Sequence, residues 1–118
     1  AEDAARELAR NTGAVVAVTG PVDFVTDGAR GWRVANGHAL MPRVTALGCS
    51  LTGLVGALLA GAEDRARATV AALAFFGLAG ERAGAIAAGP GSFQVALLDA
   101  LAAITPAELT AGARVSEA

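Results

Sequence analysis

Apolar residues recur along this chain with two periods, one of two residues and one near 3.6. Residues 14–18 form an unbroken apolar run of strand length, which predicts a strand buried on both faces with parallel neighbours on each side. Residues 22–27 and 32–35 alternate apolar and polar positions around a glycine-containing turn, which predicts a β-hairpin. A short helix is expected before the strands, over residues 3–11, with Asp3 as its cap.

The remaining chain has apolar residues at helical spacing. Helices are expected from about residue 49 to 61 and from about 65 to 87, with Glu63 and Asp64 opening the second. Gly89-Pro90-Gly91 predicts a turn between helices, and Ser92 can cap the next one. That helix carries a stripe of Phe93, Leu97, Leu101 and Ile104, and a last short helix starts at the capping box Thr105-Pro106-Ala107-Glu108.

Composition restricts the class of protein. The chain has 118 residues, enough for one domain with a core, and with 54% hydrophobic and 17% charged residues it is not expected to be disordered. The net charge of −2 and the scarcity of aromatic residues argue against a nucleic-acid partner. The apolar stretch over residues 47–62 is shorter than the roughly 20 residues of a spanning helix, so no membrane partner is expected. A single cysteine and a charged amphipathic start predict a cytoplasmic protein.

The segment Val44-Thr45-Ala46-Leu47-Gly48-Cys49-Ser50 carries the strongest candidate chemistry, because small residues lead there into an apolar helix. The first turn of a helix leaves N–H groups free and carries partial positive charge, so it can receive a phosphate. Gly48 keeps that approach open, and Cys49 places a thiol where the anion would lie. Taken alone, Cys49 also fits a small buried hydrophobe and Gly48 a simple turn.

Other polar residues give weaker signals. Thr19 follows the first strand, where its hydroxyl can donate to a nucleotide phosphate, although it can also simply end the strand. Asp23 and Asp27 are interpreted as solvated turn residues, so no metal site is predicted from their spacing. His38 stands in a loop without a neighbouring carboxylate or thiol. Gly89-Pro90-Gly91-Ser92 lacks the lysine of a phosphate loop.

Together these segments resemble the hydroxyethylthiazole kinase family of the ribokinase-like superfamily. The resemblance rests above all on the Gly-Cys pair at the start of a helix, since most ribokinase-like kinases have an acidic residue where Cys49 stands. The similar segments are Val16-Ala17-Val18-Thr19-Gly20, Val22-Asp23-Phe24-Val25, Val34-Ala35-Asn36-Gly37-His38, Leu40-Met41, Arg43-Val44-Thr45-Ala46-Leu47-Gly48-Cys49, Phe76-Gly77-Leu78-Ala79 and Gly89-Pro90-Gly91-Ser92-Phe93-Gln94-Val95.

The resemblance implies a ribokinase-like α/β layered fold, with residues 1–118 as the C-terminal portion of a single kinase domain. It implies transfer of the γ-phosphoryl group of ATP to the hydroxyethyl group of 4-methyl-5-(2-hydroxyethyl)thiazole, with Mg²⁺ bridging the phosphates. By family likeness Cys49 takes the base-like position, Thr19 contacts ATP and Gly48 belongs to the anion hole. Ala46 takes a substrate-contacting position where the family has glycine. The resemblance also implies a homotrimer with active sites between subunits.

Three other interpretations stay open at this point. The chain fits another small-alcohol kinase of the same superfamily, although Cys49 in place of an acid argues against it. It also fits a non-catalytic remnant, which Ala46 and the short length favour. A membrane or helical-bundle interaction protein is the third, and the strand pattern over residues 14–36 disfavours it.

Overall fold

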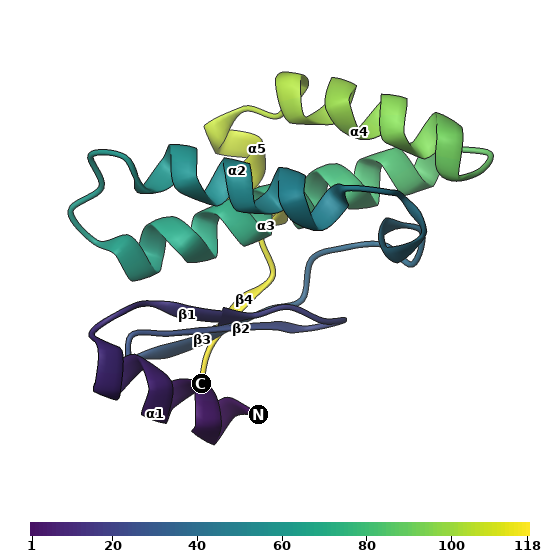
Figure 1. The fold of residues 1–118 in the computed structure, drawn as a ribbon. Coiled ribbons are helices and arrows are strands. Elements are labelled where there is room, and N and C mark those ends of the chain that lie inside the picture. The colour runs from purple at the N-terminus through teal and green to yellow at the C-terminus, as the bar shows by residue number, and fades with distance from the viewer.

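The computed structural model describes residues 1–118 and arranges them in layers (Figure 1). A four-stranded sheet has α1 on one face and α3 on the other, while α2 and α4 pack against α3. The helices are α1 (Glu2–Thr12), α2 (Leu47–Leu59), α3 (Arg65–Ile86), α4 (Pro90–Ala103) and α5 (Pro106–Gly112), and a 3-10 turn covers Met41–Arg43. The strands are β1 (Val16–Val18), β2 (Asp23–Thr26), β3 (Gly31–Val34) and β4 (Val115–Glu117).

The sheet is antiparallel throughout, in the order β1-β2-β3-β4. The predicted hairpin is confirmed, with Asp23 opposite Val34 and Thr26 opposite Gly31. The expectation for the first strand is wrong in two respects: β1 pairs antiparallel with β2, and its residues Ala17 and Val18 are exposed. The reason is that β1 lies at the edge of this sheet, with a neighbour on one side only. Strand β4 was not predicted.

The helix boundaries follow from their caps. Gly13 ends α1 with a left-handed backbone (φ 72°), but Asp3 does not cap this helix because it lies inside the first turn. Asp64 caps α3 by accepting from the Arg67 N–H at 3.2 Å. The capping box at α5 is confirmed, since Thr105 and Glu108 each bond the other's backbone N–H at 3.2 Å.

Ser92 also caps its helix, although from inside the first turn of α4 rather than from the position before it. Its Oγ accepts from the N–H of Ala88 at 3.0 Å and from that of Gly89 at 3.3 Å. Gly89 therefore stands at the cap position, and the turn between α3 and α4 is a helix–helix connection, as the sequence predicts.

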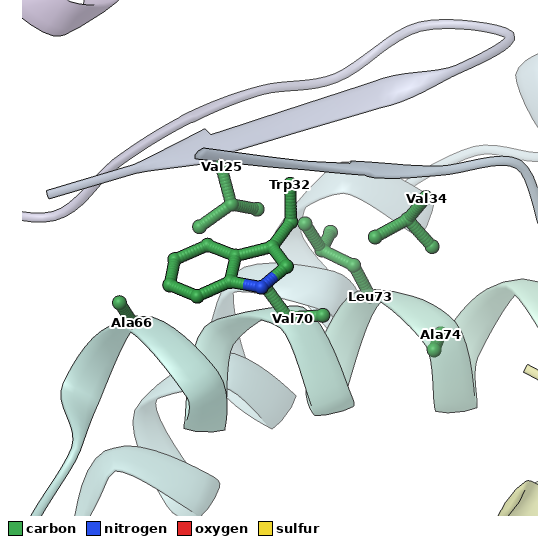
Figure 2. Packing of buried hydrophobic residues seen from close by; sticks show 7 residues of the cluster. All are labelled: Val25, Trp32, Val34, Ala66, Val70, Leu73 and Ala74. Carbon is green, nitrogen blue, oxygen red and sulfur yellow. The ribbon is translucent and has the colours of Figure 1, made fainter. Parts of the chain in front are cut away.

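Helix α3 is the centre of the molecule, because hydrophobic clusters lie on two of its sides. One cluster fills the space between α3 and the sheet, where the Trp32 indole lies against the helix (Figure 2). The other joins α3 to α4 around Phe76 and Phe93. Helix α3 is long and apolar enough to cross a membrane, but 61% of its apolar 18-residue stretch is buried inside the protein. Here it is the core helix of a layered fold.

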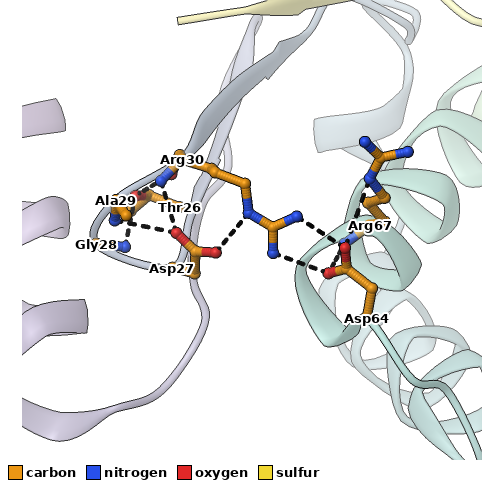
Figure 3. A network of polar contacts seen from close by, with 7 residues as sticks. All are labelled: Thr26, Asp27, Gly28, Ala29, Arg30, Asp64 and Arg67. Atoms are coloured by element: carbon orange, nitrogen blue, oxygen red, sulfur yellow. Dashed lines mark hydrogen bonds and ion pairs between the residues drawn. The ribbon is translucent and has the colours of Figure 1, made fainter.

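The hairpin turn is tied to the start of α3 by a polar network (Figure 3). Asp27 accepts from the backbone N–H of Ala29 and Arg30 at 3.0 and 2.7 Å, which closes the turn. The Arg30 guanidinium then reaches Asp64 with two hydrogen bonds of 2.8 and 3.1 Å and lies 5.0 Å from the Trp32 ring centre. This bidentate contact fixes the end of the hairpin against the N-terminus of α3.

The Arg30–Asp64 pair predicts an acid-dependent loss of stability. The hydrogen bonds from Arg30 lower the pKa of Asp64 to about 2 in the folded protein, whereas an unfolded chain has a value near 3.9. Unfolded protein therefore binds more protons between those pH values, so the pair stabilises fully above about pH 4 and is lost as pH falls through about 2. We expect Asp64→Asn, which keeps the cap acceptor, to lower the unfolding free energy at neutral pH.

Urea unfolding from pH 7 to pH 2 measures this effect. The gap between the wild type and Asp64→Asn should close towards pH 2. Asp64→Ala, which also loses the cap, should be less stable than Asp64→Asn at every pH. A gap between wild type and Asp64→Asn that does not change with pH would contradict the assignment.

Candidate functional site

A cleft of about 620 Å³ opens where the β1–β2 connection and the loop after β3 meet the start of α2. Its walls come from three segments distant in sequence, and the floor is the side of α3 that carries Leu73, Phe76 and Gly77. The lining residues of the connections and of α2 are Thr19, Gly20, Pro21, Asp23, Ala35, Asn36, Gly37, His38, Ala39, Met41, Pro42, Leu47, Gly48 and Leu51.

The start of α2 presents free backbone donors beside this cleft. Ala46 stands before the helix with a left-handed backbone (φ 66°), the only residue other than glycine with a positive φ. The first backbone bond of the helix runs from the Ser50 N–H to the Ala46 carbonyl at 3.0 Å. No side chain caps the helix, so the N–H groups of its first turn, Leu47 to Cys49, are free to donate to a ligand.

The observed boundaries of α2 correct the expected ones. The helix runs over Leu47–Leu59 rather than 49–61, so Gly48 belongs to its first turn instead of preceding it, and Cys49 is its third residue rather than its first. A side chain at Gly48 would meet nothing within 4 Å, which leaves its backbone open to an approaching anion. The turn into the helix is made by Ala46 in a conformation that L-residues with a Cβ rarely adopt.

The structure brings some of the predicted site residues together in the cleft and leaves others outside its lining. Thr19 and Gly48 line the same cleft although they stand far apart in the sequence. Ala46 and Cys49 do not line it. Cys49 has an exposed free thiol directly after Gly48. The roles of these four residues stay predictions.

Asp23 lines the cleft as its only carboxylate, and the sequence pattern did not single it out. Its Oδ1 accepts from the Gly20 N–H at 2.9 Å, so it closes the connection that carries Thr19. Burial raises the pKa of Asp23, against the lowering effect of that hydrogen bond. Asp23 thus serves a turn, as interpreted, but it is half-buried rather than solvated, and Asp27 serves the hairpin turn.

Asn36 is the second residue whose role was missed. Its buried amide donates to Glu81 at 2.6 Å and to the Gly112 carbonyl at 3.0 Å, while its Oδ1 accepts from the Arg114 N–H at 2.7 Å. Glu81 also binds the Arg114 guanidinium at 2.6 Å and accepts from the Gly37 N–H at 3.4 Å. This network connects the loop after β3, here called the cleft loop, to α3 and to the segment before β4. The one signal of the network in the sequence was the polar pair Asn36-Gly37 after a predicted strand.

His38 has a structural place in the cleft wall. Its Nδ1 accepts from the Leu40 N–H at 3.1 Å, and its ring lies 6.0 Å from that of Phe93. No group of three or more His, Cys, Asp or Glu side chains in residues 1–118 is arranged to hold a metal ion. A cation in this cleft would have Asp23 as its carboxylate neighbour and would need ligands from a bound molecule.

Comparison with known proteins places this chain in a class of layered α/β folds. The model of the Hydroxyethylthiazole kinase family matches residues 1–107. A solved hydroxyethylthiazole kinase from Pyrococcus horikoshii OT3 superposes with a TM-score of 0.92 at 41% identity, covering 99% of this chain and 46% of the other. The chain belongs to the hydroxyethylthiazole kinase family.

The curated relatives show how much of such a protein is present here. A hydroxyethylthiazole kinase from Cereibacter sphaeroides is 69% identical over all 118 residues, which are 45% of its length. One from Desulfotalea psychrophila is 56% identical over 110 residues, covering 93% of this chain and 40% of that protein. The chain thus spans about half the length of the relatives it matches.

The left-handed backbone at Ala46 yields a prediction about stability. In this conformation the Cβ crowds the following carbonyl at a cost of about 1–2 kcal/mol, which exceeds the entropic penalty of introducing glycine. We expect Ala46→Gly to raise the unfolding free energy by about 0.5–1 kcal/mol, measured by urea unfolding.

Gly13 provides the matched control. It has a similar left-handed backbone (φ 72°) and open space where a Cβ would lie. Gly13→Ala should therefore lower the unfolding free energy by a comparable amount. Ala46→Gly with unchanged or reduced stability, alongside a destabilised Gly13→Ala, would contradict the strain assigned to Ala46.

Proposed function

We propose that the protein containing this chain transfers the γ-phosphoryl group of ATP to the hydroxyethyl group of 4-methyl-5-(2-hydroxyethyl)thiazole. The observation that carries the proposal is the start of α2. Its free N–H groups lie beside a cleft whose other wall holds Thr19 and Asp23. Family membership supports the same activity, since the relatives named above are hydroxyethylthiazole kinases.

The geometry suits a reaction that is mainly positioning and electrostatic stabilisation. In the transfer, a bond forms between the substrate hydroxyl oxygen and the γ-phosphorus, and the bond to the β–γ bridging oxygen breaks. The N–H groups of Gly48 and Cys49 would stabilise negative charge on the transferring group. Thr19, which lines the same cleft, would hold a phosphate of the nucleotide, on the connection that Asp23 closes.

Cys49 is proposed to receive the proton that the substrate hydroxyl loses. Its thiol is free and exposed in the first turn of α2, directly after Gly48. Ala46, directly before the helix, is proposed to contact the alcohol substrate.

Mg²⁺ would neutralise charge on the nucleotide phosphates. The chemistry of the cleft fits an ion that arrives bound to those phosphates, because Asp23 is the single carboxylate there and Mg²⁺ commonly takes few protein ligands. Asp23 is thus the residue of this chain that would face it.

We further propose a cytoplasmic homotrimer that uses no nucleic-acid or membrane partner. The low net charge of −2 and the burial of most of α3 within the core support the last two points. The exposed residues of the edge strand β1 support an assembly in which more of the protein covers this edge.

Steady-state kinetics on the full-length protein tests the proposed function. We expect ATP-dependent phosphorylation of the thiazole alcohol, followed as ADP release and as a phosphorylated product by mass spectrometry. Cys49→Ala should lower kcat by about 100-fold or more, in the range that general base catalysis contributes. Its KM for ATP should stay close to the wild-type value, because the thiol is not a proposed nucleotide contact.

Two controls make the result specific. Superimposable thermal unfolding curves for the wild type and Cys49→Ala show that the fold is intact. Thr19→Val should mainly raise the KM for ATP. A folded wild-type protein that releases no ADP with the thiazole alcohol would instead support the non-catalytic remnant, and unchanged kcat in Cys49→Ala would remove the base role.

A further inference from the structure

The loop after β3 lies so close to α3 that three glycines of the helix face it directly. A Cβ added at Gly77 would lie 2.6 Å from the Asn36 Cβ and 2.8 Å from the Asn36 carbonyl carbon. One added at Gly84 would collide with the His38 ring. Both neighbours are held in place, Asn36 by its buried hydrogen bonds and His38 by Leu40 and Phe93.

Gly80 differs from the other two because its neighbour is flexible. A Cβ there would lie 2.5 Å from the Met41 Sδ and 3.0 Å from its Cε, the far end of an unbranched side chain. The Met41 sulfur accepts a single weak contact, from the His38 N–H at 3.4 Å. Met41 can therefore change its rotamer at low cost where Asn36 and His38 cannot move.

Met41 also lines the cleft. It is half-buried, and the apolar side chains of Leu47, Leu51 and Phe76 line the same cleft. A thiazole ring with a methyl group is an apolar aromatic ligand, and a thioether makes favourable contacts with aromatic rings. The polar side chains of Thr19 and Asp23, which also line the cleft, suit the nucleotide instead.

We propose that Met41, seated against Gly80, determines which alcohols the cleft admits by setting the space for the ring and its substituent. This inference rests on the proposed function and adds a specificity-determining residue to it. The missing Cβ of Gly80 lets the thioether withdraw from the cleft. Any side chain at position 80 must push it towards the ligand.

A pair of substitutions and their combination test this in the full-length protein. Gly80→Ala should raise the KM for the thiazole alcohol about 10-fold, the scale on which one methyl group matters in a close-fitting pocket, with the KM for ATP unchanged. Met41→Ala should increase the preference for an analogue with ethyl in place of the ring methyl by about 10-fold. In the double variant, the loss caused by Gly80→Ala should disappear.

Gly56→Ala is the matched control, because Gly56 is also a helical glycine but has nothing within 4 Å of an added Cβ and does not line the cleft. Its kinetics should equal those of the wild type. An unchanged KM for the thiazole alcohol in a folded Gly80→Ala protein would overturn the inference. So would a raised KM that persists in the double variant.

Crystal structures of the wild type and Gly80→Ala separate this inference from the proposed function. A displaced Met41 thioether and a smaller cleft in the variant support the inference even if another alcohol proves to be the substrate. A Met41 side chain in the same place in both structures would overturn it, whatever the activity. Absence of thiazole kinase activity in the wild type would contradict the proposed function alone.

Discussion

The packing of α3 is the constraint on which the rest of the structure depends. This helix must contact the sheet, α2, α4 and the cleft loop at once, and it can do so because small residues cover much of its surface. Ala72 and Ala79 are completely buried, and Gly77 lies against the backbone of Asn36. Larger side chains would hold the layers apart, since protein interiors have no spare volume to absorb them. The position of the cleft wall is thus a result of how the core packs.

The order and type of most elements could be predicted from the sequence because their signals are local. The hairpin follows from alternation around a turn, and α5 from its capping box. The burial of the first strand could not be predicted, because an apolar run specifies neither the direction nor the number of its neighbours. Strand β4 has three exposed residues and exists through its pairing with β3, which no local pattern encodes.

The residues of the candidate site also include some that local sequence patterns predict and some that they do not. The start of α2 and the strand end at Thr19 could be found from the sequence, because each depends on a short motif. The roles of Asp23 and Asn36 could not, since they arise from burial and from partners on other elements. Asn36 reaches Glu81, 45 residues away, and Arg114, 78 residues away. The backbone of Ala46 was also not predicted, because alanine carries no preference for a left-handed turn.

The Asn36 network joins the cleft wall to the segment before β4 in one cooperative unit. Arg114 contributes its backbone N–H to Asn36 and its guanidinium to Glu81 and to the Ala35 carbonyl. Local opening of that segment would leave the buried Oδ1 of Asn36 without its donor, the Arg114 N–H, so opening of the two regions is coupled. Unfolding of the segment before β4 would then also loosen the cleft loop after β3. Backbone amides in these two regions would exchange with heavy water at a common opening rate.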